Sequence, residues 1–510
     1  MRTKSSIKNI LVSTAMAIIA VVIGFISQRI FIESLGLEYL GINGLFTNII
    51  SMLGIVEIGL GSAIIYHLYR PLIELDKARI KSLLEFYKKG YRVIAGIVTV
   101  IGFIIMLFLG NIVGEVKISE NIYFIYLLFL ADVVLSYLLA YKRSILYADQ
   151  RSYIINLVHI FYTVIVNGLQ IAILLTTKDF YLYLFIKVIM HTVENIVIAT
   201  IVNIRYPYIN DTTAVQLDRL TKDDVYQKIK ALFIHKIAAF VVFGTDNIVI
   251  AIFFGIKTVG LFTNYYLIIS AINLLVDQIF MAITASIGNL LAVSNSKKSF
   301  DTYKRVRFVN FWLASISSIG LLVSADQFVT VWLGKEFILP FGVLVALTIN
   351  LYLESIRSAT SSFKEAAGIF HQDRHVPIIE SAVNIVFSIV LLQFFGLAGV
   401  FMGTICSNLV LHLFSYPKYV YTQLFKRSYK NYYLEFIEYL TIALTTGAIT
   451  FALSRAITVH GALQQLIVDV LLSVAVPSII FYLIYRKSDE FAYFKELTIK
   501  IVRKVKRVIF

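Results

Sequence analysis

Long apolar stretches, about fourteen of them, follow one another along nearly the whole chain and are separated by short loops. Each supplies the length that a helix needs to cross a bilayer, which is about 20 predominantly apolar residues. Hydrophobic residues make up 59% of the sequence and charged residues only 15%, so a water-soluble fold would lack polar surface. The sequence therefore predicts an all-α, polytopic membrane protein whose function takes place within or across a lipid bilayer.

The first apolar stretch follows three basic residues and lacks a small-residue cleavage site, which indicates a retained helix rather than a signal peptide. Cys406 is the only cysteine and lies in an apolar stretch, so no intramolecular disulfide can form. The predicted spans are 10–32, 40–68, 93–113, 122–141, 153–175, 181–204, 232–254, 259–293, 308–331, 340–356, 376–395, 397–416, 433–453 and 462–485.

The chain carries 46 Lys and Arg against 31 Asp and Glu, a formal net charge of +15. The basic residues gather in alternate loops, as positive-inside topology requires, and not on one continuous face of the kind that binds nucleic acid. We therefore expect a plasma-membrane protein with its N-terminus in the cytoplasm, and an even number of helices returns the C-terminus there. The basic, amphipathic tail Lys500–Arg507 either lies on the anionic inner leaflet or is a solvated terminus.

Short motifs recur about 220 residues apart, which indicates an internal repeat. The segment 36–41 corresponds to 255–260, 45–48 to 261–264, and 146–151 to 369–374, and each pair occupies the same place in its helical hairpin. Six helices per repeat is an even number, so both halves enter the membrane in the same direction. We expect two parallel six-helix lobes, residues 1–225 and 226–430, with a cleft between them. Residues 431–510 then hold two further helices and the basic tail.

These residues resemble the multidrug/oligosaccharidyl-lipid/polysaccharide (MOP) exporter superfamily, and within it the Wzx-type polysaccharide flippases. The resemblance covers the first twelve helices and rests on segments 36–41, 55–61, 245–250, 368–374 and 396–404. It implies alternating access, in which an undecaprenyl-pyrophosphate-linked oligosaccharide moves from the cytoplasmic to the outer leaflet for capsule, O-antigen or exopolysaccharide assembly. The implied partners are the polyprenyl-diphosphate-linked glycan and the lipid bilayer, and whether a polysaccharide polymerase acts beside the protein stays open.

Polar residues inside the spans are the candidate functional groups, because a charge at the centre of a transmembrane helix costs about 2.5–3.5 kcal/mol. Lys187, His191 and Glu194 are spaced four and three apart, which places them on one helix face. A cation, an imidazole and a carboxylate in line suit a pyrophosphate and a coupled proton. The alternative is a self-neutralised Lys–Glu stripe that stabilises helix packing.

Other spans contribute isolated charges. Arg29 has the planar fork that suits phosphate, and near a helix end it could equally snorkel to the headgroups. Asp277 could pair with Arg29 or Lys187 across the cleft, and Glu354 with Arg357 is interpreted as a structural ion pair. Glu380 is expected to be solvated. The predicted substrate-binding residues are Arg29, Lys187, His191, Asp246 and Asp277, and the predicted ion-coupling residues are Glu57, Asp132 and Glu194.

The main alternative is a cation-coupled multidrug antiporter of the same superfamily, which would need a predominantly acidic cavity. A membrane-embedded glycosyltransferase or polymerase would need a sizeable extramembrane loop, which the sequence lacks. The sequence has no Gly-rich phosphate loop, no His/Glu zinc pattern and no nucleophile elbow. We therefore expect no enzyme, no metal site and no cofactor, with H⁺ or Na⁺ as the coupling ion.

Overall fold

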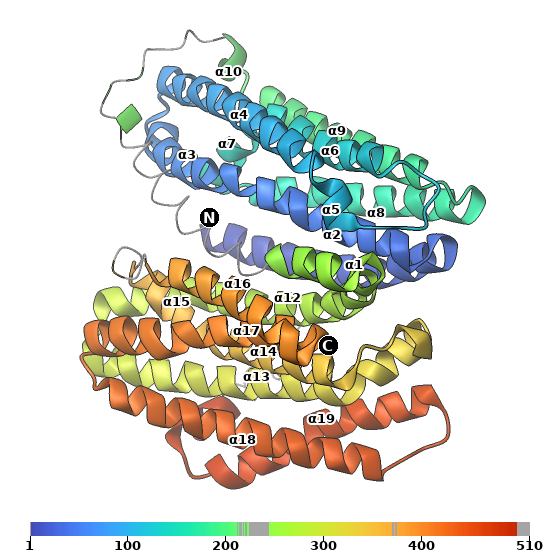
Figure 1. The fold of residues 1–510 in the computed structure, drawn as a ribbon. Coiled ribbons are helices and arrows are strands. Elements are labelled where there is room, and N and C mark those ends of the chain that lie inside the picture. Colours follow the sequence, from blue (N-terminus) through green and yellow to red (C-terminus); the bar gives the residue numbers. More distant parts are fainter. Residues whose placement is uncertain are drawn as a thin grey trace, which may run out of the picture. The chain divides into compact units, whose positions relative to one another are not determined.

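The computed structural model describes residues 2–211, 244–369 and 375–496, with a few isolated positions between these ranges. The side chains of residues 2–17, 55–64, 211, 282, 285, 292 and 293 are not among those described. Every regular element in these ranges is a helix (Figure 1), and the chain divides into two compact units, Met1–Thr263 (unit 1) and Asn264–Phe510 (unit 2). The prediction of an all-helical, polytopic membrane protein is confirmed, because twelve helices in the described ranges are long and apolar enough to cross a bilayer.

Unit 1 is a bundle of long helices that lie side by side, with α6 against α4 and α9, and α8 against α1 and α9 (Figure 1). The short helix α7 packs against α3, α8 and α9. The helices are α1 (Arg2–Leu35), α2 (Leu37–Leu53), α3 (Ile55–Glu74), α4 (Lys77–Met106), α5 (Leu109–Val113), α6 (Ile122–Ala140), α7 (Arg143–Ala148), α8 (Ser152–Thr176), α9 (Phe180–Arg205), α10 (Tyr208–Asp211) and the segment Gly244–Phe254.

Unit 2 is arranged around α13, which packs against α14, α18 and α19, while α17 packs against α14 and α16. Its helices are α12 (Ile256–Val293), whose first turns belong to unit 1, α13 (Ser296–Trp332), the 3₁₀ turn η1 (Lys335–Phe337), α14 (Phe341–Ile356), α15 (Ser358–Ala366), α16 (Val376–Phe395), α17 (Leu397–Val410), the π-helix η2 (Leu411–Leu424), α18 (Tyr429–Ala456) and α19 (Ala462–Tyr485).

Several helices differ in their bounds from the predicted spans. The predicted span 40–68 is two helices that meet at Gly54, and α4 begins sixteen residues before the predicted start at 93. The early start has a local cause, because the Asp76 carboxylate caps α4 by accepting a hydrogen bond of 2.9 Å from the Arg79 backbone amide. The first part of the predicted span 232–254 and the tail Lys500–Arg507 lie outside the described residues.

The order of elements repeats between the units. In unit 1 the long helix α6 is followed by short α7 and then by long α8 and α9, and in unit 2 long α14 is followed by short α15 and then by α16 and α17. The short helix α7 places its first residue, Arg143, directly after the C-terminus of α6.

The two glycine motifs of the predicted repeat contact each other inside unit 1. The first turns of α12 lie so close to α2 that a Cβ on Gly260 would collide with the Leu37 carbonyl oxygen, and a Cβ on Gly41 with that of Ile256. Only glycine allows two helix backbones to approach this closely. The recurrence of glycine at both positions therefore has a packing cause.

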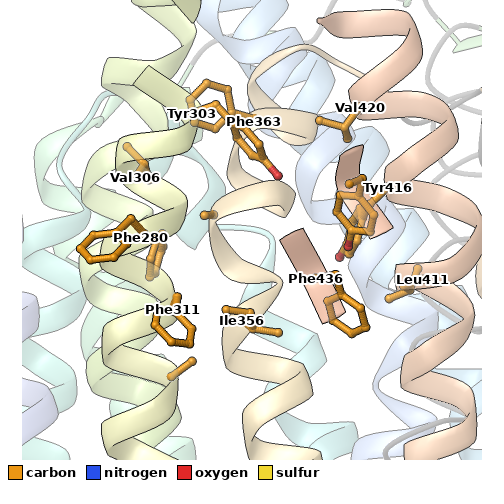
Figure 2. Packing of buried hydrophobic residues seen from close by; sticks show 14 of the residues in the cluster. Phe280, Tyr303, Val306, Phe311, Ile356, Phe363, Leu411, Tyr416, Val420 and Phe436 are labelled. Atoms are coloured by element: carbon orange, nitrogen blue, oxygen red, sulfur yellow. The ribbon is translucent and has the colours of Figure 1, made fainter. Parts of the chain in front are cut away.

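The core of unit 2 is aromatic and surrounds a buried guanidinium. Figure 2 shows Tyr303 beside Phe363, and their ring centroids are 5.2 Å apart. Arg307, one turn along α13, is buried, forms an ion pair with Glu435 of α18 and donates a hydrogen bond of 2.6 Å to the Tyr421 hydroxyl. Helix α18 is therefore held to the rest of unit 2 by an ion pair with a buried guanidinium as well as by apolar contacts.

Candidate functional site

Ionisable side chains from four helices of unit 1 lie close together among its apolar spans. The charge cluster, as we name it, comprises Asp132 of α6, Arg143 of α7, His159 of α8, and His191 and Glu194 of α9. Each contact within the cluster joins side chains of two different helices. Charged groups at such depth require partners or water, and each member of the cluster has a partner.

The first pair joins α6 and α9. His191 Nδ1 lies 2.8 Å from Asp132 Oδ1, with both side chains largely buried. One turn along α9, the Lys187 ammonium lies over the Phe129 ring, 4.6 Å from its centroid, and in electrostatic range of Asp132. Among the described residues, no oxygen accepts a hydrogen bond from this ammonium, so its donors are available to a further group.

The second pair joins α8 and α9 and adds the guanidinium from α7. The Glu194 side chain is 1% exposed, and its Oε1 lies 3.1 Å from His159 Nδ1 and 3.5 Å from Arg143 NH2. Arg143 NH2 also donates a hydrogen bond of 2.8 Å to Asn195 Oδ1. Its buried Nε, however, has no hydrogen-bond acceptor among the described residues. A buried guanidinium donor without an acceptor indicates unused capacity to bind an anion.

A tyrosine ring connects the two pairs. Tyr162 of α8 stacks on the His159 ring at a centroid distance of 5.6 Å and contacts the His191 ring at 5.9 Å. The two carboxylate–imidazole pairs therefore belong to one continuous assembly across α6, α8 and α9.

A cavity of about 340 Å³ opens beside this assembly, and Arg143 and His191 form part of its wall. Most of the remaining wall is also polar, and the lining residues come from α3, α4 and α6 as well as from α7 and α9. They are Ile65, Tyr91, Ser136, Ala140, Arg143, Ser144, Tyr147, His191 and Asn195. In the part of the chain that the structure describes, no group of three or more His, Cys, Asp and Glu could hold a metal ion.

The predicted polar face of α9 has partners on other helices rather than within itself. His191 contacts Asp132, Glu194 contacts His159 and Arg143, and Lys187 lies over Phe129. The alternative of a self-neutralised Lys187–Glu194 stripe therefore does not describe this helix. One turn beyond, Ile198 is buried and ends the polar face.

The other predicted residues of unit 1 lie apart from the charge cluster or outside the described side chains. Arg29 is exposed and pairs with Glu33 on its own helix at 2.8 Å. Asp246 lies in the helical segment Gly244–Phe254 and is partly buried. The side chain of Glu57 in α3 is not described. Their assignment to substrate or ion binding stays a prediction.

Unit 2 has its own polar group around one guanidinium. Arg357 lies 3.6 Å from Glu380 and 3.1 Å from the Asn408 side-chain oxygen, and Asp277 and Glu354 lie within its electrostatic range. The expectation that Glu380 is solvated was wrong, because its side chain is 7% exposed and faces Arg357 from α16. Asp277 thus has a cationic neighbour within its own unit.

Comparison with solved structures relates this fold to known transporters. No protein-family model and no curated protein matches the sequence. The structure of "Lipid II flippase MurJ, inward closed conformation" is similar over 93% of this chain and 99% of its own, at 13% identity and a TM-score of 0.65. An inward-facing multidrug resistance MATE family transporter of the MOP superfamily is similar over 79% and 95%, at 16% identity and a TM-score of 0.60. A MOP superfamily transporter from Pyrococcus furiosus, described with a binding pocket of reverse polarity, is similar over 80% and 92%, at 16% identity and a TM-score of 0.54.

The chain shares the fold of these solved structures. The predicted site lacked two residues that are central to the charge cluster. Arg143 lies between the predicted spans 122–141 and 153–175, and His159 is not among the predicted site residues. A polar stripe could have identified His159, because His159, Thr163 and Asn167 follow at intervals of four along α8 and the last two continue it by hydrogen bonds to the preceding turn. No local sequence pattern identifies Arg143, because its position in the cavity wall depends on how α7 packs against the other helices.

Proposed function

We propose that this protein is a membrane transporter that moves an anionic, polyprenyl-diphosphate-linked oligosaccharide from the inner to the outer leaflet. In this proposal the cavity of unit 1 receives the diphosphate. The observation that carries it is Arg143, which lines the cavity while its buried Nε has no acceptor among the described residues.

The chemistry of the site favours an oxyanion. A guanidinium donates in a fixed fork that matches phosphate geometry, and charge-assisted hydrogen bonds of this kind are roughly twice as strong as neutral ones. His191 and Asn195 supply further donors on the same wall, and the Lys187 ammonium lies one turn from His191. These groups would replace the water that a diphosphate loses when it leaves the headgroup region.

The charge balance of the cavity supports the same class of substrate. Arg143 and Lys187 offset Asp132 and Glu194, so the site is neutral when both histidines are neutral and becomes cationic with each proton they gain. The multidrug antiporter alternative needs a predominantly acidic cavity. This site does not have that charge balance. Similarity to a named lipid II flippase adds to the case for a lipid substrate.

The multidrug antiporter is a second candidate function, because unit 2 contains a group of carboxylates. There three carboxylates, on Asp277, Glu354 and Glu380, surround the single Arg357 guanidinium, which is an acidic balance suited to a cation. The structural similarity to a multidrug resistance transporter also supports this candidate. The two candidates make opposite predictions for Arg143.

The deciding experiment is removal of the protein from its host followed by analysis of the lipid fraction. The flippase proposal predicts accumulation of polyprenyl-linked oligosaccharide on the inner leaflet, and complementation with Arg143→Gln should restore about one tenth or less of export. Arg70→Gln, an exposed arginine paired with Glu74 on its own helix, is the matched control and should restore export fully. Normal glycolipid distribution together with altered dye efflux would instead select the antiporter.

A further inference from the structure

Unit 2 contains an apolar cavity that the proposed function does not use. It lies between α13, α14 and α18 and has a volume of about 210 Å³. Small residues of α18 leave this space, because Ala443 and Gly447 lie one turn apart in its wall and a Cβ on Gly447 would already reach the Ile319 side chain at 3.5 Å. A cavity of about 150 Å³ with an aliphatic and aromatic wall holds benzene, so this cavity has room for a ring or a short chain.

Three hydroxyl groups in the wall of this cavity have no hydrogen-bond partner among the described residues. They belong to Ser315 of α13 and to Thr348 and Tyr352 of α14, and all three residues are buried. Ser318, in the same wall, differs from them, because its Oγ donates a hydrogen bond of 2.7 Å to the Ala314 carbonyl oxygen. Buried polar groups are nearly always paired, so three unpaired hydroxyls in one wall indicate a role in binding a ligand.

We infer that this cavity binds an uncharged, apolar molecule with a carbonyl group, whose oxygen accepts hydrogen bonds from the hydroxyls of Ser315, Thr348 and Tyr352. The inference goes beyond the proposed function and does not depend on it, because the diphosphate is assigned to unit 1. Phe341 and Leu444 in the cavity wall are 49% and 54% exposed, so the cavity opens at the surface of two apolar spans. The ligand therefore comes from the apolar interior of the bilayer.

The composition of the wall excludes a charged ligand. In the described part of the chain, no Asp, Glu, Lys, Arg or His lines this cavity. Apart from the hydroxyls, the wall consists of aliphatic and aromatic side chains such as Leu322, Val345 and Phe451. An ionised group would lose its hydration there without gaining a partner of opposite charge.

The three hydroxyls favour a carbonyl over other uncharged groups. A carbonyl oxygen has two lone pairs, and the group carries no proton that would itself need an acceptor in an apolar wall. A hydrocarbon chain, such as a prenyl tail, would fill the space and leave all three hydroxyls unpaired. Because Thr348 and Tyr352 are four residues apart, they lie on one face of α14, and Ser315 joins them from the helix packed against it.

The test uses the full chain in detergent micelles, with acetophenone as the probe because it is uncharged and joins one ring to one carbonyl. The carbonyl is labelled with ¹³C, and its resonance moves to higher frequency when the oxygen accepts a hydrogen bond. We expect a shift that saturates at one molecule per chain and that protein-free micelles do not give. Equilibrium dialysis of acetophenone and of ethylbenzene, which has the same ring without the carbonyl, gives the ratio of their affinities.

The variant Ser315→Ala/Thr348→Val/Tyr352→Phe removes the three hydroxyls and keeps the wall apolar. It should fold, because the groups it removes have no partner among the described residues. We expect the saturable shift to disappear and the affinity for acetophenone relative to ethylbenzene to fall about fivefold or more. Ser318→Ala is the matched control and should keep both, since its hydroxyl is already paired within α13.

A wild-type shift that does not saturate overturns the inference, and so does a shift that the triple variant retains. An unchanged ratio of affinities in the triple variant overturns it as well, because the cavity would then bind apolar molecules without use of its hydroxyls. The single variants Ser315→Ala and Thr348→Val should each reduce the shift, and they decide the matter if the triple variant does not fold.

Discussion

Glu194 of α9 and His159 of α8 are hydrogen-bond partners at 3.1 Å, and the carboxylate of this pair is almost completely inaccessible to solvent. A buried carboxylate in a membrane helix is tolerated only with compensation, which here comes from His159 and from Arg143. The pair thus connects helix packing to the chemistry of the cavity.

Replacement of Glu194 by Gln tests this connection. The amide keeps the size of the side chain and a hydrogen bond to His159 but removes the charge that Arg143 balances. Under the proposed function we expect transport to fall by about tenfold or more, since a charged hydrogen bond contributes about 1.5–3 kcal/mol. The dependence of transport on the proton gradient should also weaken. Flux measured in proteoliposomes with and without a pH gradient checks both, and an undiminished gradient dependence would contradict the role of Glu194.

Under the proposed function, Lys187→Ala should weaken export of the glycan, because it removes an ammonium that lies in electrostatic range of Asp132 and has no hydrogen-bond acceptor among the described residues. The loss should exceed that of Phe129→Leu, which removes the ring beneath the ammonium and keeps the charge. Export is measured as glycan that reaches the outer leaflet in complemented cells. Equal export in Lys187→Ala and the wild type would exclude this lysine from the diphosphate path.

Arg29→Ala should also lower export, and Arg29→Lys should recover part of it, if the exposed guanidinium contacts the substrate. Glu33→Gln is the control, since it removes the carboxylate that Arg29 pairs with and leaves the cation in place. The same export assay applies. Normal export in Arg29→Ala would assign Arg29 to the membrane interface, where long cationic side chains extend to the headgroups.

Gly260→Ala should destabilise the protein by about 1–3 kcal/mol, because the new methyl group would meet the Leu37 carbonyl oxygen and force two backbones apart. Gly288→Ala, in the same helix, meets nothing within 4 Å and should be neutral or stabilising, since alanine favours helices over glycine by about 1 kcal/mol. Thermal unfolding of the purified variants in detergent gives both values. Similar midpoints for the two variants would refute the close approach of α2 and α12.

Arg307→Ala should destabilise unit 2 by about 1.5–3 kcal/mol, because it removes a buried guanidinium that pairs with the half-buried Glu435 carboxylate. Arg305→Ala provides the comparison two residues away. Arg305 is exposed and lies over the Tyr493 ring at 5.3 Å, a contact worth about 0.5–1 kcal/mol at exposed sites. Limited proteolysis and thermal unfolding should separate the two variants clearly, and a mild Arg307→Ala phenotype would show that aromatic packing alone holds α18.

Sequence patterns predicted the helices and the composition of one polar face, and they failed where contacts are long-range. Lys187, His191 and Glu194 could be placed on one face because residues three and four apart share a side of any helix. The expectation for Glu380 failed because its burial depends on Arg357, which reaches it from a helix that precedes it by more than twenty residues. The partners of Arg29, Asp246 and Asp277 across the two units stay predictions.

The sequence by itself determined that the chain spans a membrane many times as helices, because the length of an apolar run and its backbone hydrogen bonds are local properties. Only the tertiary structure decided which polar groups meet. His191 and Asp132 are 59 residues apart in the chain, and Arg143 reaches Glu194 only because α7 turns back against α9. Which side chains pair with one another depends on how the helices pack. The residues next to a side chain in the sequence do not determine that packing.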